Sequence, residues 1–341
     1  MHSCELRKRV GRLYMEVINQ ENQRSGNIEL YRCLLMFGIC FLHVLGYSGY
    51  NLLNVCGCLA WCVNAFAFIT GWYGTSFKIL KVAKLYGVAL IAFPVGMLFG
   101  HLVCGVTLED VLLLSWKAFL GLKFLHWYVI CMCFAPIIDC ALNKFKESRQ
   151  LRDIKFMIPF FVMCFSWSWL TDFNFSRPFI PCLDGLGGYT YLSIVAAYAF
   201  GRICRHLELD KKIGTRNLLR VLIVCMIPAY FRVATYASIF ANMIAASTFL
   251  LFARMKRSGR LVSKAAVLIG PSTFAIFLMH SQFWFYKNIS AWCHNVYNGD
   301  NSFISFFVCF LFGVVVFFGA LILDIPRRLV VILLRKSGVV P

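Results

Sequence analysis

Long runs of apolar residues recur along almost the whole chain. Most runs hold about 18–22 residues, the length with which an α-helix crosses a hydrocarbon layer of about 30 Å. The apolar residues do not alternate with polar ones over short segments, which favours helices over strands. The pattern predicts spanning helices at 28–48, 52–73, 82–104, 125–142, 156–171, 188–205, 217–234, 236–253, 265–286 and 303–325.

The stretch 105–124 breaks this pattern. It contains Glu109, Asp110, Lys117 and Lys123, and charged groups are costly at membrane depth. We expect a surface or re-entrant segment there. The sequence therefore predicts an all-α, polytopic membrane bundle of about ten helices.

Composition supports this interpretation. The 341 residues are 60% hydrophobic and 14% charged, whereas a soluble domain carries about a quarter charged residues. We expect a cytoplasmic N-terminal segment at 1–26, one membrane domain at 27–328 and a cytoplasmic tail at 329–341. The first apolar run is too long for a cleaved signal peptide and is expected to act as a signal anchor.

The chain is strongly basic, with 34 Lys and Arg against 15 Asp and Glu. These basic residues fall mainly in alternate connections, around 1–26, 78–84, 144–155, 202–220, 254–264 and 327–336. Cytoplasmic loops of membrane proteins collect Lys and Arg. The charge therefore predicts an even number of spans with both termini cytoplasmic, in the inner (plasma) membrane, and it requires no nucleic-acid partner.

Sixteen cysteines raise the question of a metal site. Most lie inside apolar runs, where a thiol acts as a small apolar group. Cys56 and Cys58, and Cys131 and Cys133, form C-x-C pairs without a second pair at zinc-ligand spacing. We expect no bound metal.

Three ionisable residues mark the first predicted span: Glu29, Arg32 and His43. Glu29 precedes Arg32 by one helical turn and can pair with it. Arg32 and His43 are eleven positions apart, so they share one helix face, about 16 Å apart along the axis. The spacing fits a polar passage through the bundle. It fits equally an interfacial ion pair and a core histidine bonded to a backbone carbonyl.

The Glu-x-x-Arg pattern followed by this histidine resembles the signature of the acyltransferase-3 family of membrane acyltransferases. Four further segments are similar to that family in the same order: Asn64 to Tyr73, His126-Trp127-Tyr128 with Pro136 and Asn143, Ser272 to His280, and Asp324 to Arg328. Thr70 stands where the family typically has serine, and Lys78, Lys81 and Lys84 stand where many members have an Arg-x-x-Arg pair. The resemblance covers residues 27–328.

The resemblance implies an enzyme that moves an acyl group, usually acetyl, from cytoplasmic acyl-CoA to a hydroxyl of a cell-envelope or exported polysaccharide or glycolipid. His43 would accept the hydroxyl proton, because imidazole titrates near neutral pH, and Glu29 and Arg32 would complete the catalytic face. Arg32, Lys81 and Lys84 would bind the CoA phosphates. The two lysines also fit ordinary cytoplasmic positive charge.

His126, Trp127 and His280 would lie at the substrate cavity, although each histidine also fits a structural position. No permanently bound cofactor is expected, because acetyl-CoA is a donor substrate. The implied partners are membrane lipid, acyl-CoA, a glycan or lipid-linked glycan acceptor, and, as further candidates, glycan-assembly proteins.

Other classes stay open. A transporter or flippase would also suit a polytopic bundle with intramembrane charge, and a non-enzymatic subunit of a glycan-export complex is a third reading. Five aromatic residues near predicted outer ends fit an interfacial belt, with sugar stacking as the alternative for one or two: Trp167, Trp169, Trp284, Tyr286 and Trp292.

Overall fold

The computed structural model describes residues 26–105, 107, 109, 123–147, 191–231, 236, 238–255 and 259–336. Within these ranges the ordered elements are helices, and no residue belongs to a strand. The predicted span at 156–171 and most of the 105–124 segment lie outside the described residues.

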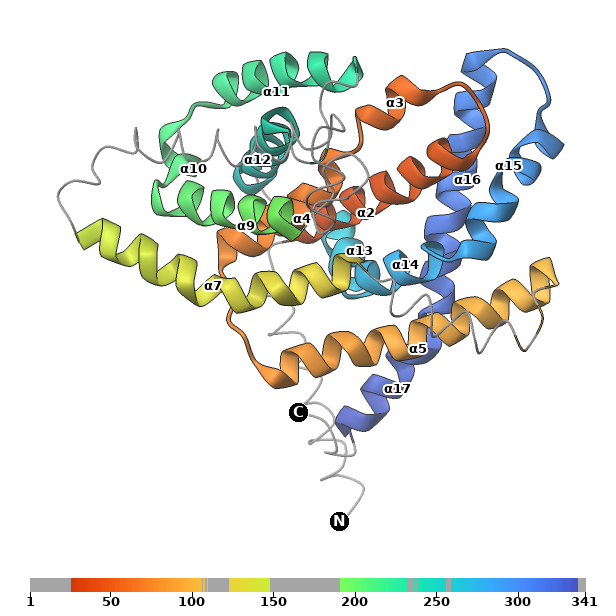
Figure 1. Cartoon of the computed structure of the whole chain (residues 1–341), viewed down its shortest axis with the longest axis horizontal. Helices are drawn as coiled ribbons and strands as arrows, with labels where there is room; N and C mark the ends of the chain where they lie inside the picture. Colours follow the sequence, from red (N-terminus) through yellow and green to blue (C-terminus); the bar gives the residue numbers. More distant parts are fainter. Residues whose placement is uncertain are drawn as a thin grey trace, which may run out of the picture.

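The helices follow the predicted apolar runs (Figure 1). Their bounds are α2 Gly26–Tyr47, α3 Leu53–Gly57, α4 Trp61–Tyr73, α5 Ile79–Cys104, α7 Lys123–Glu147, α9 Tyr191–His206, α10 Leu209–Lys212, α11 Thr215–Tyr230, α12 Ile239–Arg254, α13 Arg260–Ile269, the 3-10 turn η6 Gly270–Ser272, α14 Thr273–His280, α15 Phe283–Val296, α16 Ser302–Leu323 and α17 Ile325–Lys336.

Six helical segments of the described chain are long and apolar enough to cross a membrane. They are Gly26–Tyr47, Val55–Tyr73, Ile79–Cys104, Phe124–Lys144, Leu261–His280 and Ser302–Val331. The predicted spans at 188–205, 217–234 and 236–253 form helices of 16 residues each. Such a helix is about 24 Å long, shorter than the hydrocarbon layer. The protein is a polytopic membrane protein, and the count of ten spans stays a prediction.

Helix α2 is the centre of the bundle. It contacts α3, α4, α12, α13, α14, α15 and α16, so most of its surface is covered by protein (Figure 1). Tyr31 is fully buried and its hydroxyl lies 2.7 Å from the Thr248 hydroxyl of α12. Central burial explains how α2 can carry ionisable side chains, because they face other helices and are shielded from lipid.

Helices α4 and α9 approach each other closely through two glycines. A Cβ added to Gly71 would lie 2.0 Å from the carbonyl oxygen of Tyr198, and one added to Gly201 would lie 2.3 Å from that of Phe68. Small residues allow such backbone contact between membrane helices. The pair therefore forms a rigid wall beside α2.

The segment α13–η6–α14 runs parallel to α2. Near one end, Glu29 lies against Gly270. Toward the other end, His43 meets His280. Because the two segments run in the same direction and touch along their length, residues of the C-terminal third of the chain lie beside successive turns of α2.

The helix predicted at 265–286 is not continuous in the structure, so this part of the prediction was wrong. Pro271 lies in the 3-10 turn, and α14 ends before Gln282, whose buried side chain donates to the carbonyl of Phe93 at 3.3 Å. Proline lacks the N–H that a continuous helix needs. The buried glutamine finds its hydrogen-bond partner in the neighbouring helix α5.

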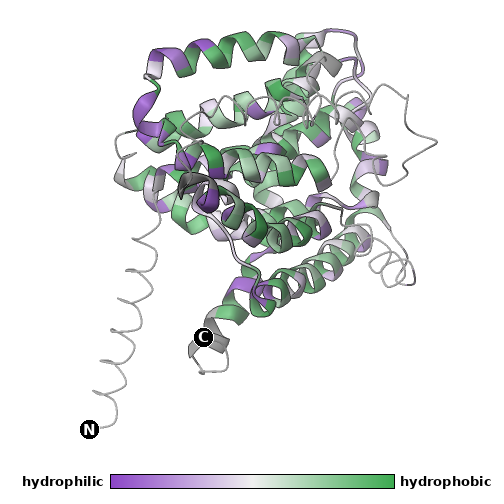
Figure 2. Cartoon of the chain, turned by 60° about the vertical axis from the view of Figure 1, so that its left-hand side comes forward, coloured by the Kyte–Doolittle hydropathy of each residue, from purple (hydrophilic) through white to green (hydrophobic). Residues whose placement is uncertain are grey.

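Residues beside three of the basic connections, 1–26, 202–220 and 254–264, lie together at one end of the bundle. Asn27 donates to the carbonyl of Met255 at 2.7 Å, and Arg254 donates to that of Leu209 at 3.0 Å. We call this the basic end; α10 marks it at the left of Figure 1, whereas α3 and α15 lie toward the right. Figure 2 shows long helices that are hydrophobic over most of their length, with hydrophilic residues at helix ends. That the basic end faces the cytoplasm stays a prediction.

Candidate functional site

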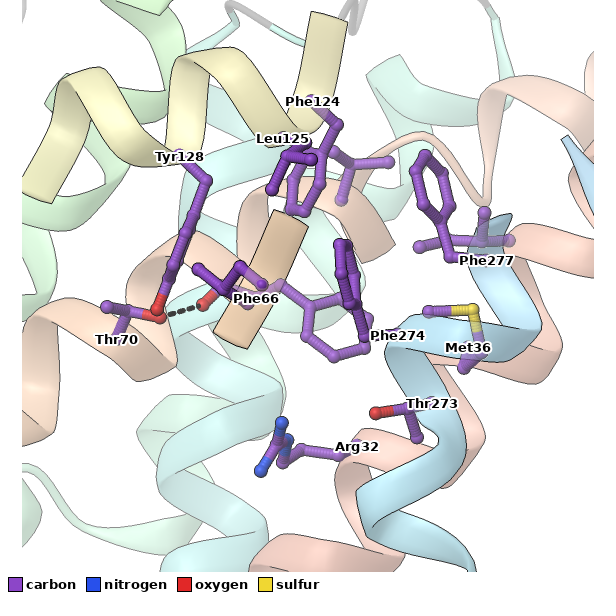
Figure 3. Close-up of a pocket in the computed structure, with 13 residues that line it drawn as sticks. Arg32, Met36, Phe66, Thr70, Phe124, Leu125, Tyr128, Thr273, Phe274 and Phe277 are labelled. Carbon is purple, nitrogen blue, oxygen red and sulfur yellow. Dashed lines mark hydrogen bonds between the residues drawn. The ribbon is translucent and has the colours of Figure 1, made fainter. Parts of the chain in front are cut away.

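One face of α2 carries a continuous series of side chains: Arg32, Met36, Ile39, His43 and Tyr47. Steps of three and four residues keep these positions on one side of a helix. Arg32, Met36 and Ile39 line a cavity of about 120 Å³ between α2, α4, α5, α7 and α14 (Figure 3). The predicted common face of Arg32 and His43 is confirmed by α2, which is helical throughout.

The rest of the cavity wall is largely apolar. It consists of Val63, Phe66, Thr70, Leu85, Phe124, Leu125, Tyr128, Thr273, Phe274 and Phe277. Figure 3 shows Arg32 away from the phenylalanine side chains, and the Tyr128 hydroxyl beside Thr70, whose own hydroxyl donates to the Phe66 carbonyl at 3.0 Å. Such a wall, apolar with a few hydroxyls and one cation, is typical of a ligand site.

Arg32 is held in place by Glu29. The guanidinium donates to the Glu29 carboxylate at 3.3 Å, and Glu29 is 4% exposed. The ion pair predicted from the one-turn spacing is therefore present. Glu29 also lies directly against Gly270, so the absence of a side chain there makes room for the carboxylate.

Substituting alanine for Gly270 is expected to displace Glu29, because the new Cβ would lie 1.9 Å from Oε2. Overpacking of this kind costs about 1–3 kcal/mol, which thermal unfolding in detergent would measure. Gly46→Ala is the control, since no described atom lies within 4 Å of its Cβ position. Adding Glu29→Asp to Gly270→Ala should restore stability, because the shorter side chain withdraws from position 270. A Gly270→Ala protein as stable as the control would contradict the contact.

A pair of histidines lies one turn beyond the cavity. His43 follows Ile39 on α2, and His280 follows Phe277 on α14, so both continue faces that line the cavity. Nδ1 of His43 is 2.9 Å from Nε2 of His280, and the Tyr286 hydroxyl is 3.2 Å from the same Nδ1. The structure therefore brings together the predicted His43 and His280 and adds Tyr286 from α15.

The hydrogen bonds decide which nitrogens carry protons. Nδ1 of His280 is 2.7 Å from the carbonyl oxygen of Ile276, which can only accept, so this nitrogen is the donor. In a neutral ring Nε2 of His280 is then an acceptor, and Nδ1 of His43 must donate to it. This assignment follows from the network. It leaves Nε2 of His43 unprotonated, and no described residue forms a hydrogen bond with that nitrogen.

The other predicted site residues do not touch the histidine pair. His126 is hydrogen-bonded to the Tyr86 hydroxyl at 2.9 Å, and it and Trp127 lie between Leu125 and Tyr128, which line the cavity. They therefore border the cavity wall without forming it.

The two lysines are exposed near the basic end. Lys81 donates to the Thr75 hydroxyl at 2.6 Å and precedes the cavity residue Leu85 by one turn of α5. Lys84 lies on the same helix without a place in the cavity wall. Binding of CoA phosphates by these lysines stays a prediction.

Comparison of the chain with family models, with curated proteins and with solved structures finds no match. The function is therefore inferred from the site itself.

Proposed function

We propose that the protein is a membrane-embedded acyltransferase that moves an acetyl group from acetyl-CoA to a hydroxyl of a cell-envelope glycan or glycolipid. The observation that carries the proposal is the oriented histidine pair. Nε2 of His43 is unprotonated and without a described partner, and His43 lies one turn of α2 beyond Ile39, which lines the cavity together with Arg32.

The pair suits general-base catalysis. Nε2 of His43 takes the proton of the acceptor hydroxyl while its oxygen attacks the thioester carbonyl. The C–S bond then breaks, and the CoA thiolate takes the proton back from His43. His280 accepts the Nδ1–H throughout and donates its own Nδ1–H to Ile276, so it fixes the His43 ring and stabilises the imidazolium. A buried carboxylate serves this purpose in a Ser-His-Asp triad.

The cavity suits the donor. Its apolar wall with scattered hydroxyls fits the pantetheine arm of CoA, which combines methylene groups with amides. Arg32 stands at the cavity's basic side and can bind a phosphate through its planar guanidinium. Lys81 adds an exposed positive charge one turn of α5 before Leu85, which lines the cavity. In this arrangement acetyl-CoA enters from the cytoplasm at the basic end, and the acceptor reaches His43 from the opposite end.

The test is acetyl transfer by the purified protein in liposomes, with radiolabelled acetyl-CoA and a panel of methyl pyranosides as acceptors. We expect labelled, base-labile esters of at least one sugar, formed in proportion to the protein. Protein that is folded, binds acetyl-CoA and transfers no label to any sugar would refute the proposal.

A transporter is the second candidate, and the break at Ser281 and Gln282 between α14 and α15 favours it, because transporters bind substrates at broken helices. Liposomes loaded with unlabelled methyl pyranoside distinguish the two functions. Counterflow of labelled sugar without acetyl-CoA would indicate transport, whereas ester formation without counterflow would indicate transfer.

A further inference from the structure

Tyr47 ends the series of side chains on the cavity face of α2. It follows His43 by one turn and is 46% exposed. Its ring is stacked on that of Tyr286, with centroids 4.3 Å apart and an angle of 20° between the planes. One face of Tyr47 is thus covered by Tyr286.

The stack leads directly to the histidine pair. Tyr286 meets His43 edge to face, with centroids 5.5 Å apart, and its hydroxyl lies 3.2 Å from Nδ1 of His43. Tyr47 and Tyr286 therefore form a pair of stacked rings beside His43.

The surroundings of Tyr47 leave its ring accessible. Gly46, Gly49 and Asn51 are exposed, and they are small or polar. No described atom lies within 4 Å of the position a Cβ would take at Gly46. Tyrosines of an interfacial belt sit at the level of the polar headgroups. The same open, polar surroundings also suit a polar ligand with one apolar face.

We propose that Tyr47 is the acceptor platform, on which a pyranose ring of the glycan stacks so that one of its hydroxyls reaches Nε2 of His43. A pyranose has a face of C–H groups and a rim of hydroxyls. An aromatic ring binds the face, and tyrosine hydroxyls bind the rim. The inference rests on the proposed function for its chemistry, and it names the class of acceptor and the residue that positions it.

Binding of methyl pyranosides, measured by saturation-transfer NMR on the full-length protein in detergent, tests the platform. We expect Tyr47→Ala to weaken binding by about two- to tenfold, because the contact with the aromatic ring is lost. Tyr47→Phe should keep most of the affinity, since it keeps the ring. Tyr230→Ala is the matched control, because Tyr230 is 48% exposed at the end of α11, which packs on α12 and α3.

The result that overturns the proposal is equal binding by wild type and Tyr47→Ala, equal losses in Tyr47→Ala and Tyr230→Ala, or no binding of any pyranoside. His43→Ala separates this inference from the proposed function. In the His43→Ala protein, adding Tyr47→Ala should still weaken pyranoside binding, although neither protein acetylates the sugar. If pyranosides bind at Tyr47 but no acetyl transfer occurs in wild type, the platform stands and the enzymatic proposal fails.

Discussion

Alanine in place of His43 is expected to reduce acetyl transfer by about 10²–10⁴-fold, the usual contribution of a general base. The loss follows from the position of Nε2, which is the unprotonated nitrogen of the pair and has no hydrogen bond from a described residue. Transfer is measured with a saturating concentration of radiolabelled acetyl-CoA, so that weaker binding of the donor is not mistaken for a slower chemical step.

Two controls show whether the loss is chemical. Thermal unfolding of His43→Ala should show a loss of about 1–3 kcal/mol, because the buried Nε2 of His280 is left without its donor, so transfer is compared below the unfolding midpoint of the variant. His101→Ala, near the C-terminal end of α5, should keep full transfer. Full transfer by folded His43→Ala would show that the base is another residue.

His280 is a positioning residue, and its variants separate orientation from packing. His280→Ala should lower transfer by about 10–100-fold, as is common for groups that orient a catalytic ligand. His280→Gln should recover part of this loss, because its amide oxygen can accept the His43 Nδ1–H. In wild type, transfer should fall on acidification, since a protonated His43 has no lone pair to offer. Equal activity of the alanine and glutamine variants would argue for packing alone.

The second large effect is on stability and concerns the contact between α4 and α9. Gly71→Ala and Gly201→Ala are each expected to cost about 1–3 kcal/mol, because the added Cβ would meet backbone oxygens at 2.0 and 2.3 Å. Backbone cannot rotate away as a side chain can, so the helices must separate. The loss would be seen as a lower midpoint in thermal or SDS unfolding.

Gly87→Ala supplies the matched control for these glycines. It also lies inside a helix, α5, but no described atom is within 4 Å of its Cβ position. This variant should be at least as stable as wild type, since alanine favours helix over glycine by about 0.8–1.0 kcal/mol. If all three variants behave alike, the close approach of α4 and α9 is not what stabilises the bundle.

Much of the helical framework could be predicted from the sequence. Apolar runs and their lengths gave helix positions close to the observed bounds, as for α5 and α16. Helical periodicity likewise placed Arg32 and His43 on one face, because it depends only on local geometry. The pairing of Glu29 with Arg32 was predictable for the same reason.

The rest depends on contacts between distant segments. Tyr286 was expected in an interfacial belt, because its proximity to His43 arises only after the chain breaks before Gln282 and starts α15. The break is hard to predict from the sequence, because a single buried glutamine can find its hydrogen-bond partner on a neighbouring helix. Tyr47 could not be predicted as a site residue for a related reason, because its stacking partner Tyr286 lies far along the chain.

The two imidazoles are separated by 237 positions in the chain, yet they stand in direct contact because α14 runs parallel to α2. During synthesis the first of them enters the membrane long before the second exists. A nascent or prematurely terminated chain therefore lacks the second imidazole, which orients the first. The pair is assembled only when the last third of the polypeptide has been inserted and has packed against α2. Under the proposed function, an unfinished copy would accordingly not consume acetyl-CoA.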